Sequence, residues 1–186
     1  ASKFENVQGL EIDLSKSFAQ LENDLPEDTV KNGLAMANTR ARLRMLTLYA
    51  VGQSNSLLVA GTGNKVEDFG VGFFTKYGDG GVDLSPIADL MKSDVFALAD
   101  YVGVIDEILK AKPTDGLWDD SRNDEDQIGA SYDELEWAML FDGDKNQLTD
   151  RQKEVIDIYN QFHSVNLHKM QPIPVCTIPE SLKIKQ

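Results

Sequence analysis

Residues 72–83, GFFTKYGDGGVD, constrain the fold more than any other stretch because they place three glycines within four positions. Glycine used this densely lets the backbone turn sharply or lets another group approach closely. The apolar run SLLVAGTGN (56–64) precedes this segment, and SPIADLMK (85–92) follows it. Because one lysine and two aspartates share the same turn, the segment predicts a ligand that carries phosphates and hydroxyls.

The elements around this segment predict an α/β fold. The run Leu57–Gly61 is typical of a parallel strand that is buried on both faces, and the alternation in Gly9–Leu14 predicts a second strand. Helices are predicted over 15–21, 29–51 and 85–102, within 105–111, and after the capping boxes Ser131–Glu134 and Thr149–Gln152, the last of them through Phe162. Such alternation favours a parallel sheet flanked by helices in one domain over 1–186. Two visible strands are few for a sheet.

The predicted helix over 29–51 carries apolar residues at steps of three and four, which indicate one buried stripe. The stripe consists of Leu34, Ala37, Ala41, Met45, Leu48 and Gly52. Arg40 and Arg44 are one turn apart and share a face, whereas Arg42 points elsewhere.

Composition excludes several classes of protein. The net charge of −13 is opposite to that of a typical nucleic-acid binder. No apolar run approaches the roughly 20 residues that a membrane span needs. Cys176 is the only cysteine, so no intrachain disulfide can form and the cytoplasm is the expected compartment.

Common catalytic motifs are absent from the sequence: there is no metal-spaced His or Cys set, no G-x-S-x-G and no P-loop. Lys92 could bind an anion near a helix N-terminus or be a surface lysine. Glu67 could bind Mg²⁺ or be an ordinary first-turn glutamate. Asp79 and Asp83 could accept ribose hydroxyls or form turn hydrogen bonds.

Six blocks together resemble the ammonia-dependent NAD synthetases, a family of N-type ATP pyrophosphatases. They are ANTRARLRMLTLY (37–49), LLVAGTGNKVED (57–68), GFFTKYGDGGVDLSPIADLMK (72–92), KPTDGLWDD (112–120), DEDQIGASYDELE (124–136) and LHK (167–169). The resemblance implies a Rossmann-like fold of the adenine nucleotide alpha hydrolase type. It also implies a ligase that joins ammonia to deamido-NAD⁺ through an adenylated nicotinate, consumes ATP with Mg²⁺ and releases AMP and pyrophosphate.

The resemblance also implies site roles, and a homodimer. Thr62, Lys92 and Thr114 are expected to contact ATP, with Lys92 as the catalytic group at the phosphates, and Glu67 is expected to bind Mg²⁺. The expected deamido-NAD⁺ contacts are Arg42, Lys76, Asp83, His168 and Lys169.

One departure from the family pattern is large. The pyrophosphate loop S-G-G-x-D-[ST] is absent from this sequence, so the chain is expected to be the later part of a family member and to turn over poorly alone. Two alternatives stay open: a non-catalytic nucleotide-binding module, and the synthetase domain of a glutamine-dependent enzyme. The GMP-forming synthetases are more distant, because that family lacks the KYGDGG block.

Overall fold

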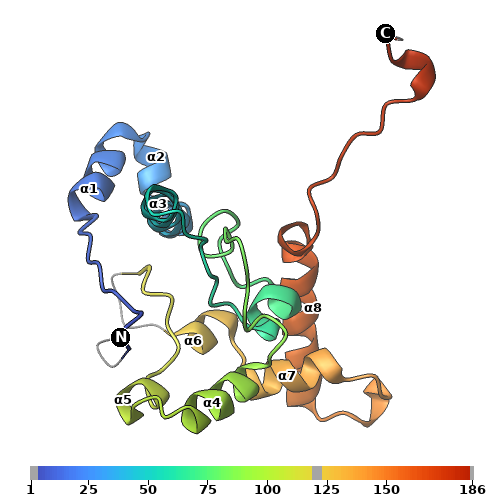
Figure 1. Cartoon of the computed structure of the whole chain (residues 1–186). Coiled ribbons are helices and arrows are strands. Elements are labelled where there is room, and N and C mark those ends of the chain that lie inside the picture. The colour runs from blue at the N-terminus through green and yellow to red at the C-terminus, as the bar shows by residue number, and fades with distance from the viewer. Residues whose placement is uncertain (1–3, 119–122, 185–186) are drawn as a thin grey trace.

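The computed structural model describes residues 4–118 and 123–184, and within them the chain is predominantly helical (Figure 1). The helices are α1 (Ser15–Asp24), α2 (Glu27–Val30), α3 (Gly33–Ser54), the π-helix η1 (Val66–Val71), α4 (Lys92–Tyr101), α5 (Asp106–Leu109), α6 (Asp124–Ile128), α7 (Tyr132–Leu140), η2 (Lys145–Gln147), α8 (Asp150–Met170) and η3 (Glu180–Leu182). After α8 the chain extends away from the other helices (Figure 1). No helix within the described ranges is long and apolar enough to cross a membrane.

The predicted parallel sheet is reduced, in the part of the chain that the structure describes, to one parallel bridge between Ala60 and Leu84. Val59 is buried there, but Leu57 and Leu58 are 65% and 70% exposed. The prediction of a strand buried on both faces is therefore wrong for these described residues. The strand predicted over 9–14 is also wrong, because that segment is irregular. The alternating apolar residues of 9–14 predicted a strand, but no segment of the described chain pairs with these residues.

The long helix predicted over 29–51 is two helices. The chain breaks after α2, and Asn32 then caps α3 by accepting a hydrogen bond from the Ala35 amide at 3.1 Å. Ala37, Ala41 and Gly52 are buried as predicted. The prediction is wrong for Leu34 and Leu48, which are 62% and 57% exposed.

The helix predicted over 85–102 begins seven residues later, at Lys92. Residues 86–89 form turns, and the amide of Met91 donates to the carboxylate of Asp94, which closes the first turn of α4. Ser85 and Pro86 therefore start a turn, because both are as common in turns as at helix starts. The predicted end at Gly103 is confirmed, with a φ of +76°. Leu98 and Val102, predicted to face inward, are largely exposed.

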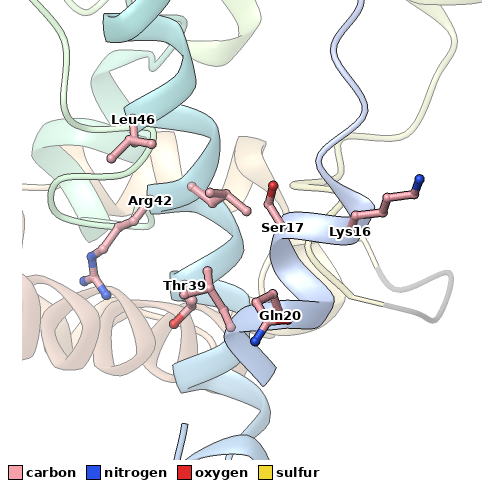
Figure 2. Close-up of a pocket in the computed structure, with 8 residues that line it drawn as sticks. Lys16, Ser17, Gln20, Thr39, Arg42 and Leu46 are labelled. Atoms are coloured by element: carbon pink, nitrogen blue, oxygen red, sulfur yellow. The ribbon is translucent and has the colours of Figure 1, made fainter. Parts of the chain in front are cut away.

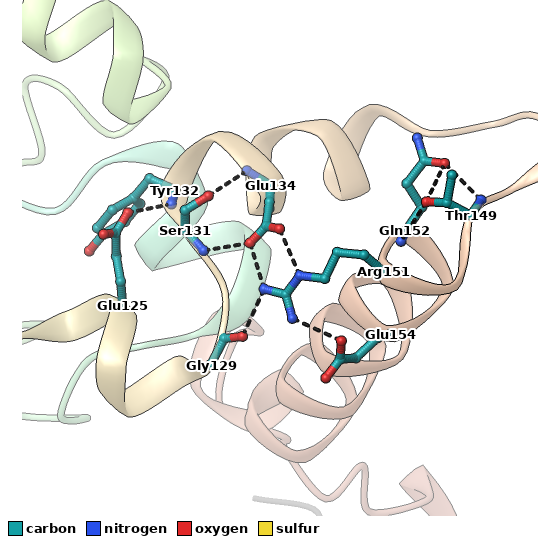
Figure 3. A network of polar contacts seen from close by, with 9 residues as sticks. All are labelled: Glu125, Gly129, Ser131, Tyr132, Glu134, Thr149, Arg151, Gln152 and Glu154. Atoms are coloured by element: carbon teal, nitrogen blue, oxygen red, sulfur yellow. Dashed lines mark hydrogen bonds and ion pairs between the residues drawn. The ribbon is translucent and has the colours of Figure 1, made fainter.

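Both predicted capping boxes are confirmed. Ser131 caps α7 and Thr149 caps α8 (Figure 3). Arg151 on α8 donates to both oxygens of Glu134 on α7, at 2.8 and 2.7 Å, and also to the Gly129 carbonyl. These hydrogen bonds, first of all those from Arg151, lower the pKa of Glu134 to about 2. Helix α8 continues to Met170, well past the predicted end at Phe162.

Two apolar clusters hold the fold together. The larger joins η1, α7 and α8 through the fully buried Val66, Val71, Leu135 and Val155, and α6 contributes Ile128. The smaller packs Ala37 and Ala41 of α3 against Leu117 and Trp118. Burial of such side chains stabilises a domain by about 25 cal/mol per Å² of apolar surface. Ala41 and Leu117 of the smaller cluster, and Phe73, which packs against the larger one, line the cavity described next.

Candidate active site

A cavity of about 480 Å³ brings together the four residues predicted to contact ATP or the metal. Thr62 follows the bridge residue Ala60, Glu67 is on η1, Lys92 begins α4, and Thr114 lies in the loop before α6. Their sequence positions span more than fifty residues, so only tertiary packing places them around one space. The structure therefore brings together this half of the predicted site.

Glu67 is the centre of a polar cluster in this cavity. Its Oε1 accepts from the Lys92 ammonium at 2.8 Å and from the Tyr132 hydroxyl at 2.7 Å, and its Oε2 accepts from the Asn64 amide at 3.3 Å. The Glu67 and Lys92 side chains are only 15% and 18% exposed, so this pair is much less screened than a surface pair. Lys92 also lies 4.6 Å from the centre of the Tyr132 ring, within cation–π range.

The π-helix geometry of η1 carries Glu67 to this position. Asn64 is buried, and its side-chain oxygen accepts from the Val66 and Glu67 amides, which begins the helix. The amide of Gly72, at a φ of +62°, donates to the Glu67 carbonyl and ends it. A single π turn inside a helical segment is frequent at functional sites.

Three residues in or beside this cluster were missed by the sequence predictions, first among them Tyr132 and Asp124. Tyr132 is buried and donates toward both Glu67 and Asp124, at 2.7 and 3.3 Å. Burial, and then the charges of Asp115 and Glu67, raise the pKa of Asp124. An aromatic residue just after a helix cap resembles a core residue, so no local pattern could have indicated Tyr132. Asp124 opens a helix, where acids are common for reasons of capping alone.

A second acidic group was also missed. Asp68, next along η1, lines a small cavity with Gly63, Asp79 and Lys169. Burial, followed by repulsion from Glu67 and Asp79, raises the pKa of Asp68 to about 6. A side chain at Gly63 would collide with the Asp68 carboxylate, since a Cβ there would lie 2.2 Å from its Oδ1. Gly63 therefore makes room for this carboxylate.

The three arginines of α3 divide as predicted. Arg40 donates to the Leu117 carbonyl, and Arg44 donates to the carbonyls of Asp115 and Gly116, at 3.3 and 2.9 Å. Both therefore hold the loop that carries Thr114. Arg42 faces elsewhere and donates to the Lys76 carbonyl at 3.2 Å.

The five predicted deamido-NAD⁺ contacts lie outside the lining of the 480 Å³ cavity, as far as the described residues define it. Arg42, Lys76 and His168 form one chain of contacts, in which the Lys76 ammonium donates to the His168 carbonyl at 2.6 Å. Asp83 accepts from the Val59 amide at 2.8 Å and from the Tyr49 hydroxyl at 3.1 Å. Its carboxylate therefore supports the parallel bridge.

Lys169, the fifth of these residues, binds backbone. Its ammonium donates to the carbonyls of Gly72 and Phe74, at 2.9 and 2.7 Å. It also lines a cavity of about 320 Å³ that shares Asp79, Asp115 and Leu117 with the 480 Å³ cavity. Burial lowers the pKa of Lys169.

A further cavity, of about 690 Å³, lies between α1 and α3 (Figure 2). Its lining includes Leu21, Leu43 and Leu46, together with Arg42. The guanidinium of Arg42 points away from α1 in Figure 2. None of the predicted ATP or metal residues lines this space among the described residues.

The oxygen donors of the active-site cavity suit a small divalent cation. Among the described residues no group of three or more His, Cys, Asp or Glu side chains could hold a metal. Mg²⁺ does not need such a group, because it commonly takes one or two carboxylates and completes its octahedron with water and substrate phosphates. Glu67 and Asp124 both line the cavity and could provide the carboxylates. The carboxylates that line this cavity are therefore compatible with a magnesium ion.

The matching family model and the curated relatives of this chain indicate the same family. The sequence profile of the family described as NAD synthase matches residues 3–172. NH(3)-dependent NAD(+) synthetases of Mesoplasma florum and Mycoplasmopsis pulmonis are 40% and 45% identical to this chain over 164 and 169 residues. These matches cover 88% and 91% of this chain but 64% and 61% of those proteins. The chain thus spans less than two thirds of the length of these curated relatives.

Two solved structures are similar. The NMN synthetase from Francisella tularensis is 30% identical, with a TM-score of 0.76, and the match covers 94% of this chain and 68% of that one. The NH3-dependent NAD synthetase from Campylobacter jejuni subsp. jejuni, in complex with the nitrate ion, is 23% identical at a TM-score of 0.66 and covers 89% and 64%. At that identity the second likeness shows the fold alone.

Proposed function

Because this chain belongs to the NAD synthase family, we propose that it catalyses the ATP-dependent amidation of deamido-NAD⁺ by ammonia. The nicotinate carboxylate attacks the α-phosphorus of ATP, and the bond to pyrophosphate breaks. Ammonia then attacks the acyl carbon of the adenylate, AMP leaves with the electron pair of the broken C–O bond, and one proton is lost from nitrogen. Adenylation is needed because a free carboxylate is a poor electrophile.

The observation that carries this proposal is the convergence of Thr62, Glu67, Lys92 and Thr114 on one cavity. Phosphoryl transfer depends mainly on positioning and on positive charge near the phosphates. Lys92 provides a fixed ammonium for the departing pyrophosphate, and the two threonines provide hydroxyls for the nucleotide. Glu67 would bind Mg²⁺, which neutralises phosphate charge when it is bound.

The adjoining 320 Å³ cavity supports a place for the second substrate. Phe73, Phe74 and Trp118 line it together with Asn38 and Lys169. Flat aromatic walls with a few polar groups suit a nicotinate ring. Lys76, Arg42 and His168 are proposed to contact the rest of deamido-NAD⁺, and Asp83 is proposed to act through the bridge that it supports.

The test is a product assay with ATP, Mg²⁺, ammonium and deamido-NAD⁺. Formation of NAD⁺, AMP and pyrophosphate in equal amounts is expected, at a rate well below that of a relative that carries the S-G-G-x-D-[ST] loop. Glutamine in place of ammonium tests the glutamine-dependent alternative. Binding of deamido-NAD⁺ without any NAD⁺ formed would favour the alternative of a non-catalytic binding module and would refute the proposed activity.

A second candidate is the same reaction on the mononucleotide, which would form NMN. The observation that favours it is the likeness to the NMN synthetase from Francisella tularensis. The curated relatives named above favour NAD⁺ instead. Competition between the carboxylate precursors of NAD⁺ and NMN in one reaction would decide which of the two has the higher kcat/KM.

A homodimer is proposed as the assembly. Leu48 lies on α3 and is 57% exposed, which leaves apolar surface for a second copy to cover. Leu48→Asp should lower the oligomer mass measured by sedimentation. An unchanged sedimentation coefficient would contradict this interface.

A further inference from the structure

Asp124 has a buried carboxylate oxygen with no hydrogen-bond partner. Its side chain lines the 480 Å³ cavity, and the residue is only 7% exposed. Among the described residues, its Oδ1 is the single buried side-chain nitrogen or oxygen without a hydrogen-bond partner. Burying a carboxylate oxygen without a donor is costly. Such an atom in a native fold requires a reason, and a bound cation is one of the few available.

The other oxygen of Asp124 is only weakly satisfied. Its Oδ2 lies 3.3 Å from the Tyr132 hydroxyl, but that hydroxyl lies 2.7 Å from Glu67. A hydroxyl has one proton to donate, so the shorter contact to Glu67 takes it. The hydroxyl oxygen of Tyr132 therefore lies between the two carboxylates, and it neutralises the charge of neither.

The surrounding charges leave the cavity negative. Glu67, Asp124 and Asp115 all line it, and Lys92 pairs with Glu67. Arg44 adds a second positive charge to the lining and Asp79 adds a fourth carboxylate, so carboxylates still outnumber cations among the described residues around the cavity. One further positive charge beside Glu67 and Asp124 would therefore be favourable.

The backbone holds Asp124 close to the proposed nucleotide site. Its amide donates to the Pro113 carbonyl at 3.1 Å, which ties the start of α6 to the residue before Thr114. Asn123 caps the same turn, so the Asp124 position is fixed from both sides. A ligand group for a cation needs this kind of preorganisation.

We propose that Asp124 binds the divalent cation together with Glu67, and that Tyr132 is a positioning residue that spaces the two carboxylates. This inference rests on the proposed function only for the expectation that a divalent cation accompanies ATP. The ligand class is a hard divalent ion, Mg²⁺ or Mn²⁺, because oxygen donors favour such ions.

The test is a titration of the protein with Mn²⁺, without nucleotide, in which free Mn²⁺ is followed by electron paramagnetic resonance. Asp124→Asn keeps the shape and removes the charge, and should weaken Mn²⁺ binding by about tenfold or more. Asp133→Asn is the matched control, because Asp133 is exposed on the first turn of α7. The control should bind as the unmodified protein does.

A double variant tests whether the two carboxylates share one ion. Glu67→Gln should weaken Mn²⁺ binding as Asp124→Asn does, and the combined loss should be smaller than the product of the two single losses. One Mn²⁺ ion still bound with unchanged affinity in each single variant would mean separate sites and would overturn the proposal. Wild-type Mn²⁺ affinity in a folded Asp124→Asn protein would also overturn it.

A measurement on the unmodified protein decides the matter if the Asp124 variant fails to fold. Bound Mn²⁺ should broaden the ring resonances of Tyr132, identified by their loss in Tyr132→Phe. Unbroadened Tyr132 signals at saturating Mn²⁺ would refute the inference. Normal Mn²⁺ binding without NAD⁺ formation would refute the proposed function alone, so the two failures are distinguishable.

Discussion

Lys169 has one role implied by the family resemblance and a different role in the structure, and the two can be separated by experiment. The resemblance implies a contact with deamido-NAD⁺, whereas in the structure the ammonium donates to the carbonyls of Gly72 and Phe74. We predict that Lys169→Met, which keeps the apolar stem, lowers the stability of the protein substantially. The reason is that both carbonyls lie in the turn that follows η1, and the substitution leaves them without this donor.

The size of the effect follows from these contacts. A hydrogen bond with a charged donor is worth about 1.5–3 kcal/mol net, and the ring of Phe74, 5.4 Å away, adds about 0.5–1 kcal/mol. An ordered methionine loses about as much rotamer entropy as a lysine, so this contribution cancels in the substitution. The loss of even one of the two hydrogen bonds together with the ring contact is therefore expected to cost about 2–4 kcal/mol, which corresponds to a fall in Tm of roughly 4–16 °C for a chain of this size.

The assay is thermal unfolding followed by circular dichroism, with Lys153→Met as the matched control. Lys153 is on the same helix and meets Asp150 only at 3.8 Å on the surface, so its loss should cost at most about 0.5 kcal/mol. A Tm for Lys169→Met equal to that of the control, with a raised KM for deamido-NAD⁺, would refute the structural role.

Three further predictions follow from the same geometry. Lys92→Ala should weaken ATP binding much more than deamido-NAD⁺ binding in calorimetry, and equal losses would mean a structural role. Gly72→Ala should lower the free energy of unfolding by about 2–4 kcal/mol, because φ is +62° and a Cβ would meet an α8 side chain at 2.5 Å. Gly103→Ala, at a φ of +76° in open space, should lower it by only about 1–2 kcal/mol. Equal unfolding free energies for the two variants would contradict this. Because hydrogen bonds from Arg151 lower the pKa of Glu134 to about 2, Glu134→Gln should be less stable than the unmodified chain by about 1 kcal/mol above pH 5, after allowance for solvent screening. That difference should vanish as the pH falls from about 4.5 to 2. Urea unfolding across this pH range measures it, and a stability difference that does not change with pH would contradict the prediction.

Local signals in the sequence were sufficient for the helix starts at Ser131 and Thr149 and for the stop at Gly103, since each depends on atoms within four residues. The same reasoning failed at Ser85 and Pro86, where a turn and a helix start share the same residue types. It also ended α8 too early. The last turns of that helix are polar, and they are held by His163 and Lys169, which bind carbonyls near the end of η1.

The candidate site, like the fold, could be predicted from the sequence only in part. Sequence reasoning and family resemblance named Thr62, Glu67, Lys92 and Thr114, but not that they surround one cavity. Tyr132 could not be identified from the sequence, because its role depends on contacts with Glu67 and Asp124, which are 65 and 8 residues away.

The sequence by itself determined the residue types of the site, the capped helix starts and the family, because these depend on chemistry that a few neighbouring residues carry. Only the tertiary structure decided that Glu67 pairs with Lys92, that Asp83 supports a bridge and that Asp124 keeps an unpartnered oxygen. These outcomes depend on which distant segments pack together. Burial and hydrogen bonding are set by that packing, and no short pattern of residues encodes it.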